Sequence, residues 1–317
     1  MTVQKFQDFE SAGKATLAFL HNKFGFGLWM VTRTRGNDWI VLQSEDHGYG
    51  VAPGKVFNWA DTFCSEMDKG NGPRFAPDSD SVPAYAAAQI GKQIPIRAYI
   101  GAPLTSADGE LFGTLCAIDP ERQPDALVAD QDLIELLATM LSTILSAELR
   151  VAEESRRSER LAVEALVDPM TNLSNRRAWD QLVTREEERC RRYGHAATVF
   201  VIDLDSLKQL NDDVGHSAGD ALILLAAEAL RDIAREIDIV ARLGGDEFGV
   251  VAVECDSAGA DIVLERIRDA FAIRKVDASV GFAIRNPETG ITVAWENADA
   301  NMYAEKKAKR NPHRVSA

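Results

Sequence analysis

Residues 238–253, DIVARLGGDEFGVVAV, decide the fold of the C-terminal half of this 317-residue chain. Two apolar runs flank Gly244-Gly245, and glycines in a tight turn permit positive φ angles and a close approach of a ligand to the backbone. The stretch therefore predicts two strands joined by a turn that presents Asp246 and Glu247. Taken alone, this acidic pair is most simply interpreted as the solvated tip of a hairpin.

A second acidic pair ends another strand upstream. Residues 197–205, ATVFVIDLD, have the apolar run of a buried strand. Asp203 and Asp205 share one face of it, because side chains two apart on a strand point the same way. Carboxylates at the end of a buried strand are costly unless a cation meets them. If the two strands are neighbours, Asp203 and Asp246 converge into oxygen ligands that suit Mg²⁺, with Mn²⁺ as the alternative.

The rest of the C-terminal half alternates helical and strand patterns. Apolar residues at helical spacing mark one helix face: Leu222, Leu225, Ala229, Ile233 and Ile237. Further helices are expected at 176–193, 262–271 and 295–309, and a strand is expected at 277–284. This alternation predicts an α+β or α/β domain with a central, mostly antiparallel sheet.

The middle of the chain, residues 127–167, contains neither Pro nor Gly and predicts one long linker helix that Pro169 stops. Its apolar seam consists of Leu133, Leu137, Met140, Ile144 and Leu145. After residue 150 the helix becomes strongly charged, VAEESRRSERLAVEAL. Two interpretations stay open: a coiled coil with the same helix of a second copy, or a single solvated helix.

The N-terminal part, residues 1–126, mixes strand and turn patterns. Its clearest feature is residues 98–119, AYIGAPLTSADGELFGTLCAID, in which two apolar runs surround Asp108-Gly109 and predict a hairpin. The aromatic residues of this part either line a pocket or fill a core: Trp29, Trp39, Trp59, Phe63 and Tyr85.

The composition limits the cellular setting and the partners. Hydrophobic residues make up 46% and charged residues 26% of the chain, the balance of a globular protein. The net charge of −14 argues against nucleic-acid or anionic-membrane partners held by bulk electrostatics. The N-terminus lacks the apolar stretch of a signal peptide, and no apolar run is long enough for a membrane span. A cytoplasmic protein with reduced cysteines is expected.

The run RLGGDEF, residues 242–248, matches the signature of the GGDEF family of diguanylate cyclases. Three further stretches resemble motifs of the same family: 168–179 (DPMTNLSNRRAW), 203–220 (DLDSLKQLNDDVGHSAGD) and 298–311 (ADANMYAEKKAKRN). The resemblance implies a palm-like, nucleotidyl-cyclase-like domain over residues 168–317. It also implies condensation of two GTP molecules into cyclic di-GMP and two pyrophosphates, with a homodimer as the active form because the product has two-fold symmetry.

The resemblance also assigns roles to single residues. Asp203, the carbonyl of Leu204 and Asp246 are implied as metal ligands. Glu247 is implied either as a second metal ligand or as the acceptor of the proton of the attacking hydroxyl. Asn211 and Asp220 match the pair that reads the guanine edge, and Lys208, Lys306 and Arg310 match cations that hold the triphosphate.

Three positions depart from the family pattern. Leu207 stands where the family usually has Phe, Glu305 where it has Ala, and Lys309 where it has Gly. Glu305 places a negative charge next to Lys306, so weaker GTP binding is one expected consequence.

Nine residues before Gly244, Arg235 and Asp238 form an RxxD pattern that resembles the inhibitory product site of the family, with Arg266 as its supporting arginine. The alternative is an i,i+3 surface ion pair.

Residues 11–149 resemble a GAF domain, so residues 1–126 are expected to form a GAF-like sensor domain above the linker helix. The ligand is unknown, and a ligand sensor and a pure dimerisation scaffold are both open. For the whole chain, the intact acidic and cationic positions favour an active, regulated cyclase. The alternative is a catalytically silent receptor for GTP or cyclic di-GMP.

Overall fold

The computed structural model describes residues 6–162 and 166–310, which fall into two compact units. Unit 1 comprises residues 1–153 and 192–194, and unit 2 comprises residues 154–191 and 195–317. The division between the units lies within one helix, α5 (Gln131–Ala162).

Unit 1 is built on a six-stranded sheet in the order β3-β2-β1-β6-β5-β4, and all neighbouring strands are antiparallel. Its strands are β1 (Leu28–Arg35), β2 (Asp38–Asp46), β3 (Val56–Asn58), β4 (Phe75–Ala76), β5 (Ala98–Thr105) and β6 (Leu111–Asp119). Its helices, besides the first part of α5, are α1 (Phe9–Phe24), α2 (Phe63–Asp68), α3 (Pro83–Ala87) and α4 (Ile90–Gln93).

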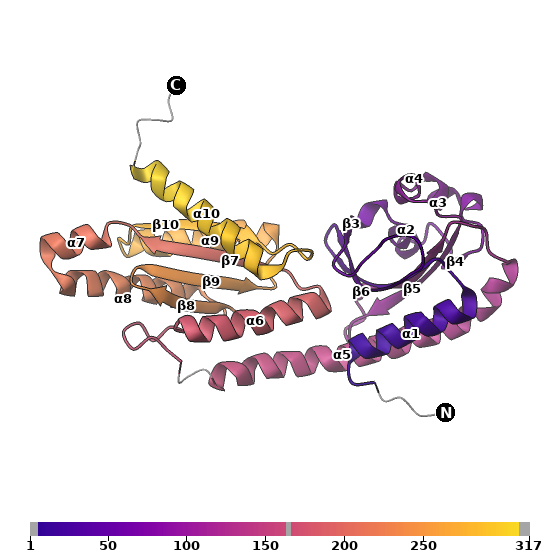
Figure 1. Ribbon diagram of the computed structural model, residues 1–317, viewed down its shortest axis with the longest axis horizontal. Helices are drawn as coiled ribbons and strands as arrows, with labels where there is room; N and C mark the ends of the chain where they lie inside the picture. Colours follow the sequence, from indigo (N-terminus) through magenta and orange to yellow (C-terminus); the bar gives the residue numbers. More distant parts are fainter. Residues whose placement is uncertain (1–5, 163–165, 311–317) are drawn as a thin grey trace, which may run out of the picture. The chain divides into compact units, whose positions relative to one another are not determined.

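Alternation along the strands of unit 1 divides its core between the two faces of the sheet. Trp29 and Leu115 pack with α1 and α5 on one face, and Figure 1 shows these two helices side by side. Met30 and Cys116 pack with α2, α3 and α4 on the other face. The hairpin expected around Asp108-Gly109 is confirmed as β5 and β6.

Unit 2 is a four-stranded antiparallel sheet in the order β10-β7-β9-β8. Its strands are β7 (Ala197–Leu204), β8 (Ile239–Gly244), β9 (Glu247–Val253) and β10 (Ala278–Ile284). Its helices, besides the end of α5, are α6 (Arg176–Tyr193), α7 (Leu207–Val214), α8 (His216–Ile233), α9 (Ser257–Ile273) and α10 (Gly290–Arg310). The expected central, mostly antiparallel sheet is therefore confirmed.

Helices cover both faces of this sheet, as the alternation along β7 requires. Phe200 and Ile202 pack with α8 and α9 on one face. Val199 and Val201 pack with α6 and α10 on the other. Because β7 is central and buried along its whole length, its last residues are held firmly at one edge of the sheet.

Most of the two expected helix faces is confirmed, with one exposed residue on each. On α8, Ala229 is buried and Leu222 and Ile233 pack against the core, whereas Leu225 is 38% exposed and Ile237 lies beyond the end of the helix. On α5, Leu145 is buried and Leu137 and Ile144 pack against the core, whereas Met140 is 52% exposed. The centres of the two buried faces were missed: Ile223, Ala226, Ala227 and Leu230 on α8, and Ile134, Ala138 and Leu141 on α5. The long helix also begins at Gln131 rather than at residue 127, because residues 125–130 form a 3₁₀ helix.

Across residues 6–162 and 166–310, none of the helices combines the length and the apolar character that crossing a bilayer requires.

Candidate active site

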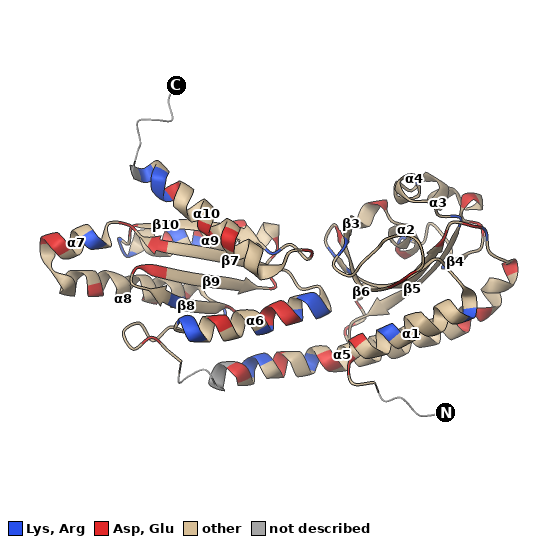
Figure 2. Cartoon of the chain, in the orientation of Figure 1, with Lys and Arg blue, Asp and Glu red and all other residues tan. Residues whose placement is uncertain are grey.

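The end of β7 lies beside the start of β9. Asp203 is opposite Glu247 in the antiparallel register, and the backbone N–H of Leu204 donates to the carbonyl of Asp246 at 3.0 Å. Figure 2 shows acidic residues at these two strand ends and basic residues towards the end of α10. The strands are neighbours, as the sequence argument required, and the acidic residues they carry lie at one edge of the sheet.

Asp203 is an unusual carboxylate because it is only 8% exposed. Burial raises the pKa of Asp203 above its ordinary value; the hydrogen bond and charge of Lys306 oppose this shift, and the negative charge of Asp246 adds to it. A buried carboxylate with an acidic neighbour is stabilised by a nearby cation. The edge of the sheet is therefore a place that favours positive charge.

Two lysines of α10 supply that positive charge. The ammonium group of Lys306 donates to the carboxylate of Asp203. The ammonium group of Lys309 donates to Oδ2 of Asp205 at 2.9 Å, and the hydroxyl of Ser279 donates to Oδ1 of Asp205 at 2.9 Å. Lys306 therefore contacts a proposed metal ligand, and its ammonium group has further donors beside the one that Asp203 accepts.

The charge of Glu305 is offset by its neighbours. Its carboxylate is 3.0 Å from the guanidinium of Arg268 and 3.4 Å from the ammonium group of Lys309. Two of the three departures from the family pattern, Glu305 and Lys309, thus neutralise each other in part. The weaker GTP binding expected from Glu305 stays a prediction.

The turn between β8 and β9 is fixed by arginines. Arg242 donates to the carbonyl of Gly245 at 2.9 Å and is 3.3 Å from the carboxylate of Asp168. Arg176, the first residue of α6, donates to the carbonyl of Leu243 at 3.1 Å. These contacts join the turn to residues 168–176, so the backbone that carries Asp246 and Glu247 is held from both sides.

The two proposed guanine-reading residues lie on facing helices, Asn211 on α7 and Asp220 on α8. The carbonyl oxygen of the Asn211 side chain is buried and has no hydrogen-bond partner among the described residues. A Cβ atom at Gly219 would lie 2.1 Å from this oxygen, so the position next to Asp220 has to be glycine for Asn211 to lie as it does. Lys208 is exposed on α7.

The RxxD residues make a local network. Arg235 donates to Oδ1 of Asp238 at 2.8 Å and also to the carbonyl of Val253. Arg266 of α9 donates to the carbonyl of Ile233, at the end of α8. The three residues named from the sequence therefore gather around one loop, and the ion pair that was the alternative interpretation is present as well.

Two expectations, about the metal ligands and about one cation for the triphosphate, stay predictions. Within the described parts of the chain, no three His, Cys, Asp or Glu side chains are grouped closely enough to hold a metal ion by themselves. The side chain of Arg310, the last described residue of α10, lies outside the described atoms.

Unit 1 contains a small apolar cavity of about 20 Å³. Trp39 and Phe63 are among its lining residues, whereas Tyr85 belongs to the core on the same face of the sheet and Trp29 to the core on the opposite face. A cavity of this volume has room for about one water-sized group, so in this conformation it is far too small for a nucleotide.

Two residues of unit 2 escaped the sequence argument. Gly219 could have been found, because a glycine beside a proposed base-reading residue indicates close packing. Arg156 could not have been found from the residues around it, because it lies in the charged run of α5 and is nevertheless only 8% exposed.

Comparison with known proteins agrees with the motifs. Residues 165–312 match the family described as "Diguanylate cyclase, GGDEF domain", and residues 11–149 match the GAF domain family. Diguanylate cyclase DgcP of Escherichia coli K12 is 31% identical over 243 residues, which cover 73% of this chain and 71% of that protein. Probable diguanylate cyclase DgcC of the same strain is 33% identical over 177 residues, or 53% of this chain and 47% of that protein.

A third relative, diguanylate cyclase DgcP of Pseudomonas aeruginosa PAO1, is 32% identical over 216 residues, which cover 65% of this chain but only 32% of that protein. Among solved structures, the GGDEF domain of DgcB from Caulobacter crescentus in complex with c-di-GMP is 31% identical. The match covers 45% of this chain and 91% of that chain, with a TM-score of 0.43.

Proposed function

The chain belongs to the GGDEF family of diguanylate cyclases, and from this premise we propose that it joins two GTP molecules into cyclic di-GMP and releases two pyrophosphates. The observation that carries the proposal is the edge of the sheet where Asp203 lies opposite Glu247, with Asp246 hydrogen-bonded through its backbone to β7. This edge gathers negative charge where a phosphoryl transfer enzyme needs to hold cations.

In the proposed reaction the 3′-hydroxyl of one GTP attacks the α-phosphate of the other. A new phosphodiester bond forms, the bond to pyrophosphate breaks, and the hydroxyl proton passes to a base; the same step repeats to close the ring. We assign the role of base to Glu247. Its side chain is 48% exposed and its ion pair with Arg176 is long, at 3.9 Å, so a substrate hydroxyl can reach it.

A divalent ion fits the donor set at this edge. Asp203 and Asp246 supply carboxylate oxygens and Leu204 a backbone carbonyl, and Mg²⁺ or Mn²⁺ commonly takes one or two carboxylates and draws its other ligands from water and phosphate. The ammonium group of Lys306 on Asp203 marks the place where positive charge is stabilised. A bound ion would neutralise charge that develops on the transferring phosphate.

Base recognition is assigned to Asn211 and Asp220. The buried, unpartnered oxygen of Asn211 can accept a hydrogen bond from the exocyclic amine of guanine. The carboxylate of Asp220 can accept from N1–H. Lys208, Lys306 and Arg310 are proposed to hold the triphosphate.

We propose that the active form is a homodimer, because one unit 2 offers one such edge and the product is two-fold symmetric. The proposal is tested by incubating the purified protein with GTP and Mg²⁺ and identifying the product by mass spectrometry. Cyclic di-GMP with two equivalents of pyrophosphate is expected. Binding of cyclic di-GMP without any synthesis would instead identify a silent receptor.

Product feedback is proposed to act through Arg235, Asp238 and Arg266. We expect Arg235→Ala to abolish inhibition by added cyclic di-GMP with little change in the initial rate. Arg235 is distant from Asp203 in the sequence and lies on a different loop, so its loss should leave the proposed catalytic residues in place. The measurement is the initial rate at increasing product concentration, with Arg150→Ala, an exposed arginine of α5, as the control. Unchanged inhibition in Arg235→Ala would reduce the RxxD pattern to a surface ion pair.

Regulation by the GAF domain is proposed to act through α5. If two copies of α5 pair, the rotation between the units sets how two active edges face each other. We expect insertions between Glu153 and Glu154 to change the cyclase rate periodically, since each added residue rotates a helix by about 100°. Four added residues, about one turn, should therefore be tolerated better than two. The rate is measured across insertions of one to seven residues, and a flat series would make α5 a passive tether.

A further inference from the structure

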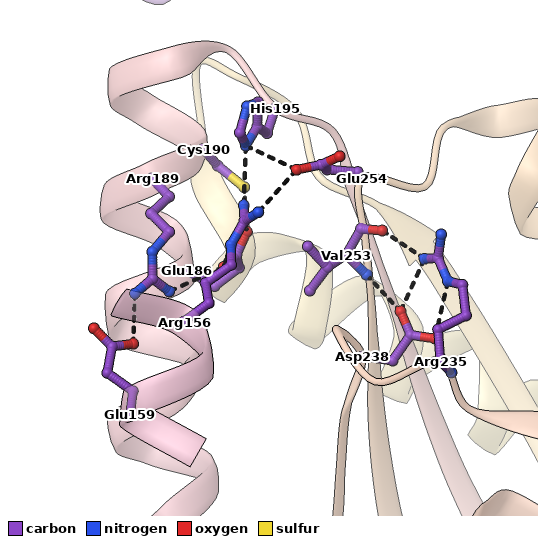
Figure 3. A network of polar contacts seen from close by, with 10 residues as sticks. All are labelled: Arg156, Glu159, Glu186, Arg189, Cys190, His195, Arg235, Asp238, Val253 and Glu254. Carbon is purple, nitrogen blue, oxygen red and sulfur yellow. Dashed lines mark hydrogen bonds and ion pairs between the residues drawn. The ribbon is translucent and has the colours of Figure 1, made fainter. Parts of the chain in front are cut away.

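The end of α5 is attached to the rest of unit 2 by a buried group of charged side chains. The guanidinium of Arg156 is 3.0 Å from the carboxylate of Glu186 on α6, and both side chains are almost completely buried. A second arginine of α6, Arg189, bridges Glu186 to Glu159, which lies one helical turn after Arg156 on α5. Figure 3 shows these side chains converging between the two helices. Neighbouring Arg157 does not take part in this buried group: it is 80% exposed, and its ion pair with the exposed Glu236 is long, at 3.9 Å.

Arg156 has two further partners, which lie outside the two helices. Its Nη1 donates to Oε1 of Glu254 at 2.9 Å, and its Nη2 lies 3.0 Å from Nδ1 of His195. Glu254 is the first residue after β9. Its φ angle is 55°, in the left-handed region that a non-glycine residue rarely adopts. Such a conformation persists where surrounding contacts hold it, so the contact with Arg156 depends on the placement of this short segment.

The same segment is bound from its other side by the RxxD residues. The side chain of Arg235 donates to the carbonyl of Val253, and the backbone N–H of Val253 donates to Oδ1 of Asp238 at 3.1 Å. Val253 and Glu254 are consecutive, so one end of a strand is held by Arg235 and Asp238 on one side and by Arg156 on the other (Figure 3).

We propose that occupancy of the Arg235–Asp238 site and attachment of the end of α5 are coupled through the Val253–Glu254 segment. The inference rests on the proposed role of Arg235 in binding cyclic di-GMP. A phosphate that takes the guanidinium of Arg235 competes with its contacts to Asp238 and Val253. The segment then loses a support, Glu254 is freer to leave Arg156, and the end of α5 loosens. Because coupling between two sites is reciprocal, loosening the helix end also tightens product binding.

The first test measures hydrogen exchange of the full-length protein with and without cyclic di-GMP. Product is expected to speed exchange of the amides of residues 154–159 by about fivefold or more, while α1 in unit 1 serves as the internal reference. Unchanged or slower exchange at residues 154–159, under conditions in which cyclic di-GMP is shown to bind, would overturn the coupling and leave the cyclase proposal standing. Failure of cyclic di-GMP to bind the wild-type protein would remove the product site itself.

The second test measures the Kd of cyclic di-GMP by calorimetry for Glu254→Gln and for the control Arg150→Gln, at an exposed arginine of α5. Glu254→Gln keeps the shape of a partly exposed side chain but removes the charge that Arg156 meets, so it should fold. It is expected to bind product about fivefold more tightly than the wild type, whereas Arg150→Gln should match the wild type. Equal affinities in all three proteins, or weaker binding by Glu254→Gln, would overturn the coupling. Arg156→Lys, which keeps the charge but not the fork of donors, should resemble Glu254→Gln.

Discussion

Glu247→Gln is expected to lower the rate of cyclic di-GMP synthesis by about a thousandfold while the protein stays folded and still binds GTP. The substitution removes the proposed acceptor for the 3′-hydroxyl proton and one negative charge from the edge where Asp203 lies. Its cost in stability should be small, because the side chain is about half exposed and its ion pair with Arg176 is long. Exposed ion pairs contribute about 0–1 kcal/mol, far less than the loss in transition-state stabilisation.

The experiment separates chemistry from binding. Initial rates are followed by pyrophosphate release and by mass spectrometry of the product, and affinity is measured with 3′-deoxy-GTP, which lacks the attacking hydroxyl. Glu265→Gln, an exposed glutamate of α9, is the matched control and should behave as wild type. Turnover within tenfold of wild type in Glu247→Gln would show that another group accepts the proton. Asp203→Asn should also abolish synthesis, and wild-type activity there would contradict the metal assignment.

The strands of unit 2 could be predicted because their pattern has one interpretation. Along β7 the apolar residues are continuous, as a strand covered on both faces requires, and the run stops at the acidic end. The turn after β8 is marked by two glycines, so the pairing of β8 with β9 follows from local chemistry alone. The placement of Asp203 near Glu247 then needed one assumption, that β7 and β9 are neighbours.

The faces of α5 and α8 could not be placed as well, for a physical reason. Residues 221–230 of α8, ALILLAAEAL, are apolar almost all the way round, so two adjacent helix faces fit the periodicity equally well. Packing selects the face with Ala226 and Ala227, because small side chains let the helix approach the sheet closely, and it leaves Leu224 and Leu225 partly exposed. The periodicity of one helix does not contain the information about which of its apolar faces packs on the sheet.

Buried charge is the feature that sequence reasoning misses most completely. The partners of Arg156 are 30, 39 and 98 residues away along the chain. Its own surroundings, EESRRSE, have the composition of a solvated helix. Lys306 shows the same limit of sequence-based prediction at the acidic ends of β7 and β9. Its motif predicts a phosphate contact, whereas its contact with Asp203 depends on the packing of α10 beside β7.

Asn211 and Asp220 are expected to set which nucleotide the enzyme accepts. Asp220 offers an acceptor to N1–H of guanine, but N1 of adenine is itself an acceptor, so a carboxylate facing it would be repelled. The buried oxygen of Asn211 would likewise lose its donor. Sites built to hydrogen-bond one substrate reject an analogue without that group by about 10⁴-fold or more. We therefore expect the wild-type protein to prefer GTP over ATP by about that factor.

Asp220→Asn is expected to raise KM for GTP about a hundredfold and to narrow the preference over ATP, because an amide can donate to N1 of adenine as well as accept from guanine. The fold should be unaffected, since Asp220 is exposed on α8. Gly219→Ala serves as an independent probe of the same site: the added methyl group would meet the Asn211 oxygen and displace it without altering any charge. It should raise KM for GTP and leave the Asp220 carboxylate in place. The comparison is kcat/KM for GTP and ATP in each variant, with Asp213→Asn on α7 as the control. Equal use of GTP and ATP by the wild-type protein would show that Asn211 and Asp220 do not read the base.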